Sequence, residues 1–280
     1  MAPQIKFSSP AKRKRKIAYA KKAAWFLAFM LAVSGGSLFL LRNENLLVDE
    51  VKISGNSSIS SLEIQTLIED NLLGDYFRIL PKKSIFFYPR RGIEKSIKEK
   101  FPGVSQAAAS WESLSSPRAL GIHVSERSPA YIWCGNLPAE ENGGCFFTDN
   151  TGVVYDSVPE KEKSKFVVLY GSLSGNVAKG AFLSEDDFLQ LSSFIISASE
   201  NGLLPVSLIK KIDGDAELLL APGGKIIFSL SEIAGDSDFA ISNLESALES
   251  QSLKSAIKKN PEKLLYVDLR FGNKVFFKFK

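Results

Sequence analysis

An uncharged run of 19 residues, from Ala23 to Leu41, is the feature that most constrains how this chain can fold. As a helix it would extend roughly 28 Å, close to the hydrocarbon thickness of a bilayer. Residues 1–22 hold eight Lys or Arg and no acidic residue, and such clusters stay on the cytoplasmic side. The pattern predicts a basic cytoplasmic tail (1–22), one transmembrane helix (23–41) and an extracytoplasmic remainder at the cell membrane.

Two alternatives for the apolar run stay open. A cleaved signal peptide would use the small residues Ala32, Val33 and Ser34 as its cleavage site, whereas a buried core helix would use the run for packing. Residues 38–41 lengthen the run past a usual signal core, which weighs against cleavage. The adjacent basic cluster weighs against a core helix.

The basic character of the chain belongs to the tail alone. The chain carries 35 basic and 31 acidic residues, and eight of the basic ones lie in residues 1–22, so the remainder has a net charge of −4. A KRKRK run can bind nucleic acid, but its place before an apolar run favours retention at anionic lipid heads. We therefore expect no nucleic-acid partner.

Hydrophobic periodicity after the apolar run predicts an α+β protein with two domains. Residues 46–126 follow the order βααββ, with strands at 48–54, 104–111 and 119–126 and helices at 61–73 and 92–101. Residues 75–91 look irregular and contain an aromatic cluster, SIFFY. Residues 127–280 predict a mixed β-sheet with two helices, at 185–200 and 236–259.

The cysteine and histidine content limits the chemistry that the chain can carry. Cys134 and Cys145 are an even pair that suits a disulfide in an oxidising compartment, worth about 3 kcal/mol, with two free buried thiols as the alternative. His123 is the only histidine, so a zinc site or a histidine-activated nucleophile is not expected. Glu126, Arg127 and Asp149 suit a surface ion pair and a turn better than a catalytic carboxylate pair. We expect no enzyme activity, cofactor, metal or small-molecule substrate.

The last two expected strands, LLYVDLR and KVFFKFK, are the best candidate for a binding site. A hairpin that sets apolar against apolar places Val267 opposite Phe277 and Leu265 opposite Phe279, with the connection 271–273. Lysines on a terminal strand usually guard against aggregation. Phe276 among them suits an interface, and a free edge can accept a partner strand. The predicted partner-binding residues are Tyr266, Arg270, Phe271, Gly272, Asn273 and Phe276.

Four segments give the chain a family likeness: VDEVKISGNSSISSLEIQTLI, IEKSIKEKFPGVSQAAAS, ALGIHVSERSPAYIWC and FFTDNTGVVYD. Their order, after a basic tail and an apolar run, resembles that of the FtsQ/DivIB family of bacterial cell-division proteins. The resemblance implies a POTRA domain at 46–126 and a β domain at 127–280. It also implies binding of small single-span coiled-coil proteins, FtsB and FtsL, near VDLRF, where Phe271 stands in place of a frequent Tyr.

The resemblance implies a divisome scaffold that recruits and bridges division proteins at the septum. An exported peptidoglycan-remodelling enzyme, or a regulator of one, is the alternative from another class.

Overall fold

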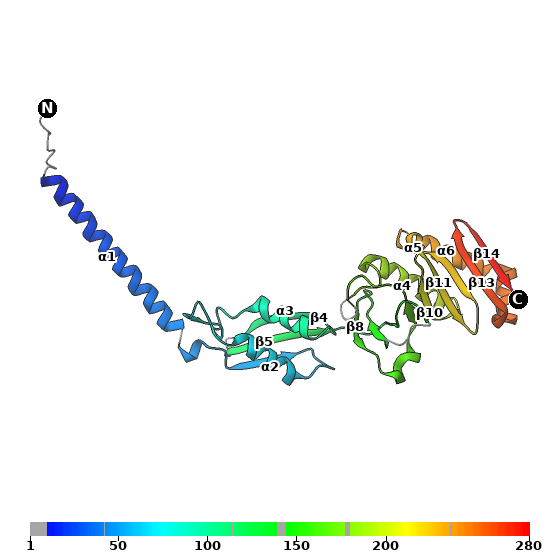
Figure 1. Cartoon of the computed structure of the whole chain (residues 1–280), viewed down its shortest axis with the longest axis horizontal. Coiled ribbons are helices and arrows are strands. Elements are labelled where there is room, and N and C mark those ends of the chain that lie inside the picture. The colour runs from blue at the N-terminus through cyan, green and yellow to red at the C-terminus, as the bar shows by residue number, and fades with distance from the viewer. Residues whose placement is uncertain (1–9, 42, 114, 139–143, 177–179, 236) are drawn as a thin grey trace, which may run out of the picture. The chain divides into compact units, whose positions relative to one another are not determined.

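The computed structural model describes residues 10–41, 43–113, 115–138, 144–176, 180–235 and 237–280 (Figure 1). The chain divides into two compact units, Met1–Ser125 and Glu126–Lys280. Each unit has its own buried apolar cluster.

The predicted membrane anchor lies within the N-terminal helix α1 (Pro10–Leu41). Over the described residues, no helix is long and apolar enough to cross a bilayer. Ser34, Gly35 and Gly36 lie inside the run and lower its hydropathy, since they contribute little apolar surface. The transmembrane helix at 23–41 is wrong, and so are the single-pass topology and membrane localisation inferred from it. Part of the basic tail, residues 1–9, lies outside the described residues.

Unit 1 contains a three-stranded sheet with the order β1-β5-β4 and two helices packed on it. Its elements after the short 3-10 helix Glu44–Leu46 are β1 (Glu50–Ser54), α2 (Ser61–Leu72), β2 (Asp75–Tyr76), β3 (Leu80–Pro81), α3 (Arg90–Lys100), β4 (Val104–Ser113) and β5 (Ser116–Glu126). Helix α2 buries Ile64, Ile68 and Leu72, which are spaced four residues apart and therefore share one face. Strand β1 runs parallel to β5, with Ile53 opposite Ile122.

Residues 75–81 differ from the irregular segment that the sequence predicts. Strands β2 and β3 pair antiparallel as a small hairpin, with Tyr76 opposite Leu80. The Lys82 N–H donates to the Gly74 carbonyl at 3.1 Å and closes the base of this hairpin.

Unit 2 is built on a nine-stranded mixed sheet with the order β14-β13-β12-β11-β10-β9-β6-β7-β8. Its strands are β6 (Tyr131–Trp133), β7 (Phe146–Thr148), β8 (Val154–Ser157), β9 (Val168–Tyr170), β10 (Leu204–Lys210), β11 (Asp215–Ala221), β12 (Lys225–Ser229), β13 (Leu264–Phe271) and β14 (Lys274–Phe279). Strands β6, β9 and β10 are parallel neighbours, and β12 is parallel to β13. A helical connection joins β9 to β10 and another joins β12 to β13, as parallel pairing requires.

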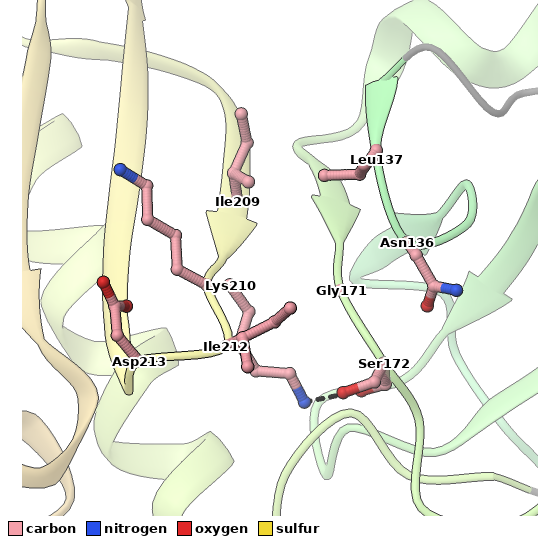
Figure 2. Close-up of a pocket in the computed structure, with 9 residues that line it drawn as sticks. Asn136, Leu137, Gly171, Ser172, Ile209, Lys210, Ile212 and Asp213 are labelled. Carbon is pink, nitrogen blue, oxygen red and sulfur yellow. Dashed lines mark hydrogen bonds between the residues drawn. The ribbon is translucent and has the colours of Figure 1, made fainter.

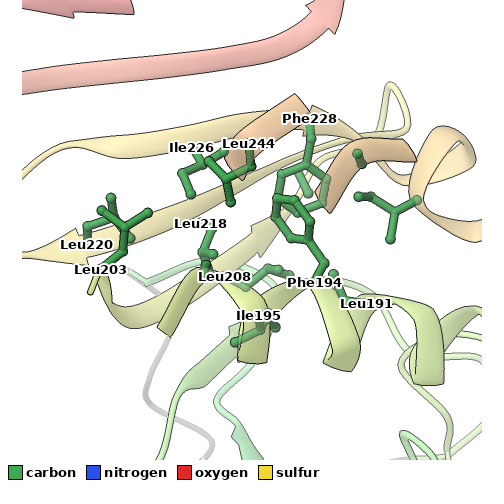
Figure 3. Close-up of a cluster of buried hydrophobic side chains, with 14 of the residues drawn as sticks. Leu191, Phe194, Ile195, Leu203, Leu208, Leu218, Leu220, Ile226, Phe228 and Leu244 are labelled. Atoms are coloured by element: carbon green, nitrogen blue, oxygen red, sulfur yellow. The ribbon is translucent and has the colours of Figure 1, made fainter. Parts of the chain in front are cut away.

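The main core of unit 2 lies between one face of this sheet and its helices. Leu191, Phe194 and Ile195 of α4 (Glu185–Glu200) face the side chains of β10–β12 (Figure 3). The other helices are α5 (Leu230–Gly235), α6 (Ser237–Glu249) and α7 (Gln251–Lys259), with 3-10 helices at Glu160–Lys165 and Pro261–Lys263. The expectation of two helices is therefore wrong. The second expected helix is replaced by α6 and α7, separated at Ser250, and α5 precedes them.

Candidate functional site

The terminal hairpin, strands β13 and β14, forms one edge of the nine-stranded sheet (Figure 1). Strand β14 pairs with β13 on one side. Among the described strands, none pairs with its other side. The backbone groups on that side can therefore accept a strand from another chain.

The observed register of the hairpin matches the predicted register in the middle and differs from it at both ends. Val267 lies opposite Phe277, as apolar matching predicts. Phe271 pairs with Lys274, so the turn contains two residues, Gly272 and Asn273, rather than three. A bulge reconciles the two observations, because Leu269 and Arg270 together oppose the single residue Val275.

A second irregularity changes the start of the hairpin. Leu264, not Leu265, pairs with Phe279 and is buried in the core. The expected pairing of Leu265 with Phe279 is therefore wrong.

Two predicted binding residues meet at the turn end of the hairpin. The rings of Phe271 and Phe276 lie edge to face with centroids 5.0 Å apart. They are 54% and 49% exposed. Phe276 lies opposite Asp268, on the sheet face away from the helices, because the neighbouring Val267 points into the core. This arrangement places aromatic surface next to the free edge of β14.

The guanidinium of Arg270 is partly exposed and is anchored by two carboxylates. It contacts Asp268 at 2.7 Å and Asp215 of β11 at 2.6 Å. The side-chain hydrogen bond from Arg270 is the largest cause that lowers the pKa of Asp268, which is almost fully buried. Arg270 also lies 6.0 Å from the Phe271 ring centroid. These contacts suit Arg270 to hold the Phe271 ring in place more than to contact a partner directly.

Helix α6 fixes the hairpin turn. The Asn243 side-chain amide donates to the Gly272 carbonyl at 2.9 Å. Gly272 has a φ of 61°, a conformation that glycine adopts without steric cost. Asn273 is exposed beside it, whereas Tyr266 lies toward the other end of the hairpin, opposite Lys278. Five of the six predicted residues are therefore grouped around the turn, and Tyr266 is not.

A second candidate region is a recess of about 700 Å³ at the carboxyl ends of the parallel strands β6, β9 and β10. Leu137 and Ile212 point into it from opposite walls (Figure 2). Ile212, in the β10–β11 turn, is fully exposed. Crevices at the carboxyl ends of parallel strands are common binding positions.

Two lysines, Lys210 and Lys211, line this recess. The Lys210 ammonium donates to the Ser172 carbonyl at 2.5 Å and to the Phe182 carbonyl at 2.7 Å (Figure 2 shows the first of these bonds). Burial lowers the pKa of Lys210. No local sequence pattern predicts this region, because the pairing of three strands distant in sequence creates it. In the sequence, only the apolar Ile212 directly after Lys210 and Lys211 indicates a surface of this kind.

The cysteines are joined in the structure. A disulfide links Cys134, just after β6, to Cys145, just before β7, and both side chains are buried. The bond closes the hairpin that contains residues 139–143, which lie outside the described residues.

Arg127 and Asp149 form an ion pair, which is mostly buried rather than at the surface as expected. The Asp149 carboxylate also accepts from the backbone N–H groups of Thr151 and Val153, at 2.9 and 3.0 Å. It therefore stabilises a turn.

The histidine has one polar neighbour of chemical interest. His123 Nδ1 lies 3.2 Å from the Ser54 hydroxyl, on the exposed side of the sheet in unit 1. Catalysis by such a pair usually needs a third group that orients the imidazole. Within the described parts of the chain, no cluster of three or more His, Cys, Asp or Glu side chains is placed to hold a metal ion.

No protein-family model matches the chain, and a search of curated proteins finds no similar one.

Proposed function

We propose that this chain is a protein-interaction scaffold of bacterial cell division, of the kind that the FtsQ/DivIB resemblance implies. Its terminal hairpin is the docking site. The partners are small single-span coiled-coil proteins of the FtsB and FtsL type, which add a segment along β14.

The observation that carries the proposal is that, among the described strands, none pairs with the outer edge of β14. A free strand edge supplies backbone hydrogen bonds to an incoming strand, and flanking side chains supply specificity. Phe271 and Phe276 stand beside this edge as exposed aromatic groups. Exposed aromatic residues next to an arginine are the composition typical of interface hot spots.

The surroundings of the two rings favour a preorganised site. Arg270 is anchored by Asp268 and Asp215, and Asn243 holds the Gly272 carbonyl. A surface that is already ordered loses less conformational entropy when a partner binds. The binding role is thereby divided between rings that contact the partner and polar residues that position them.

The decisive experiment compares Phe276→Glu with wild type in binding to purified FtsB-type and FtsL-type proteins from the same source. Loss of a hot-spot ring and burial of a charge should weaken the Kd by about tenfold or more. Ile212→Glu is the matched control, because it places the same charge on an exposed apolar residue outside the hairpin. Truncation after Arg270 is unsuitable, since Val275 and Phe279 pack against the core.

The outcomes separate the site from the function. An unchanged Kd for Phe276→Glu, with wild-type binding intact, would place the docking site elsewhere. Absence of binding by the wild-type chain would contradict the scaffold proposal. Turnover of peptidoglycan by the wild-type chain would favour the enzyme alternative.

A further inference from the structure

The hairpin β2–β3 carries an unusual turn. The Ile79 N–H donates to the Tyr76 carbonyl at 3.0 Å, and the two central residues, Phe77 and Arg78, have φ values of 51° and 59°. Turns of this hand usually contain Gly, Asn or Asp, because a Cβ atom is crowded at positive φ. Phe77 is 93% exposed, so its ring gains no packing in return for this conformation. Strained residues of this type are concentrated at functional sites.

A second apolar turn follows in the same segment. Phe86 and Phe87 are exposed, whereas the flanking residues Ile85 and Tyr88 pack against the core of unit 1. The buried Ser84 fixes this turn, because its carbonyl accepts from the Phe87 N–H at 3.1 Å. The exposure of the two rings is therefore imposed by a defined backbone.

The same segment is strongly basic. Residues 74–91 contain five Lys or Arg and one acidic residue, Asp75. Lys82 and Lys83 lie between the two apolar turns, and neither makes an ion pair with a carboxylate in the described part of the chain. At the end of the segment, Arg90 pairs with Glu94 of α3 at 2.9 Å. Lys83 shares a recess with Asp49, Glu50 and Glu69 but lies outside ion-pair distance of them. Exposed aromatic rings and lysines outside the ion pairs of the described residues are thus combined in one stretch.

We propose that residues 74–91, the aromatic-basic segment, dock unit 1 on an anionic lipid surface. Phe77, Phe86 and Phe87 enter the headgroup boundary, and Lys82 and Lys83 approach the lipid phosphates. Neither charge nor apolar area suffices alone for stable surface binding, and this segment supplies both. The contact concerns side chains on a folded domain and depends neither on helix α1 nor on the terminal hairpin.

Single-stranded nucleic acid is the competing ligand, since bases also stack on aromatic rings beside cations. Two features favour lipid. The exposed apolar groups include the aliphatic Ile79, which offers no stacking surface. Phe77 is also 93% exposed at the tip of a hairpin, whereas nucleic-acid strands usually follow a basic groove.

The test places an environment-sensitive nitrobenzoxadiazole dye on the full chain through Phe77→Cys. The native cysteines are joined in a disulfide and do not react with the dye. We expect a blue shift of the emission with phosphatidylcholine vesicles that contain phosphatidylglycerol, and none without it. The dye reports its own surroundings, and the lysine variants below separate contact by this segment from attachment of the vesicle to basic residues 12–16.

Two variants complete the design. Ile212→Cys carries the same dye at an exposed apolar position of unit 2 and should show no shift. Lys82→Gln with Lys83→Gln should lower the ratio of inserted to free dye at position 77 by about 30-fold, which corresponds to about 1 kcal/mol for each lysine. An equal shift at positions 77 and 212, a shift independent of phosphatidylglycerol, or a response to a single-stranded oligonucleotide alone would overturn the proposal.

Discussion

Removal of the disulfide should destabilise unit 2 by an amount that its loop length determines. Cys134 and Cys145 are separated by 11 positions in sequence. The chain-entropy relation gives about 9 cal/mol/K for a loop of this size, or about 2.8 kcal/mol at 25 °C. Serine in place of both cysteines avoids a lone thiol but leaves two small polar groups in a buried site. We therefore expect the free energy of unfolding to fall by about 3 kcal/mol.

Urea unfolding monitored by Trp133 measures this loss. Trp133 precedes Cys134 and is buried, and its indole N–H donates to the Gly171 carbonyl at 2.8 Å. Phe in place of Trp25 and Trp111 leaves it as the sole tryptophan. A reducing agent should destabilise the wild-type chain equally and leave the double serine variant unchanged. A loss below about 1 kcal/mol would refute the loop-entropy reasoning.

Two further predictions concern the core and the ion pairs of unit 2. Phe194→Ala should cost about 3–5 kcal/mol in urea unfolding, because its ring is fully buried and lies 4.8 Å from that of Phe228; a loss below about 1 kcal/mol would contradict this packing. The hydrogen bond from Arg270 lowers the pKa of Asp268, so this pair stabilises the fold above the unfolded pKa of about 3.9, and the contribution is lost as the pH falls through the folded pKa. Thermal unfolding between about pH 5 and pH 2 should therefore depend less on pH in Asp268→Asn than in wild type, and identical slopes would exclude the linkage.

Local sequence patterns predict the positions of α2, α3 and α4. The expected helices at 61–73 and 185–200 correspond to α2 and α4 within one residue, because their apolar positions repeat along one helical face. For the apolar run, absence of charge does not indicate sufficient hydropathy, because Ser34, Gly35 and Gly36 lower it.

The features that the sequence does not predict depend on an unusual backbone conformation or on pairing between strands that are distant in sequence. Phe77 and Arg78 have no preference for positive φ, so nothing local indicated the hairpin β2–β3. The bulge opposite Val275 is set by the fit of β13 into the sheet, and the turn length alone could not indicate it. The recess near Lys210 exists because β9 lies between β6 and β10, an order that no short stretch of sequence encodes.

The strand order of unit 2 has a consequence for how the sheet is assembled. From β9 onward, each strand lies beside its predecessor in the chain, up to β14. The sheet can thus grow by accretion at a single edge while the chain is synthesised from its N-terminus, each strand serving as the template for the next. A partner strand on β14 would then be the next addition in this series, recognised by the same backbone chemistry that assembled the domain.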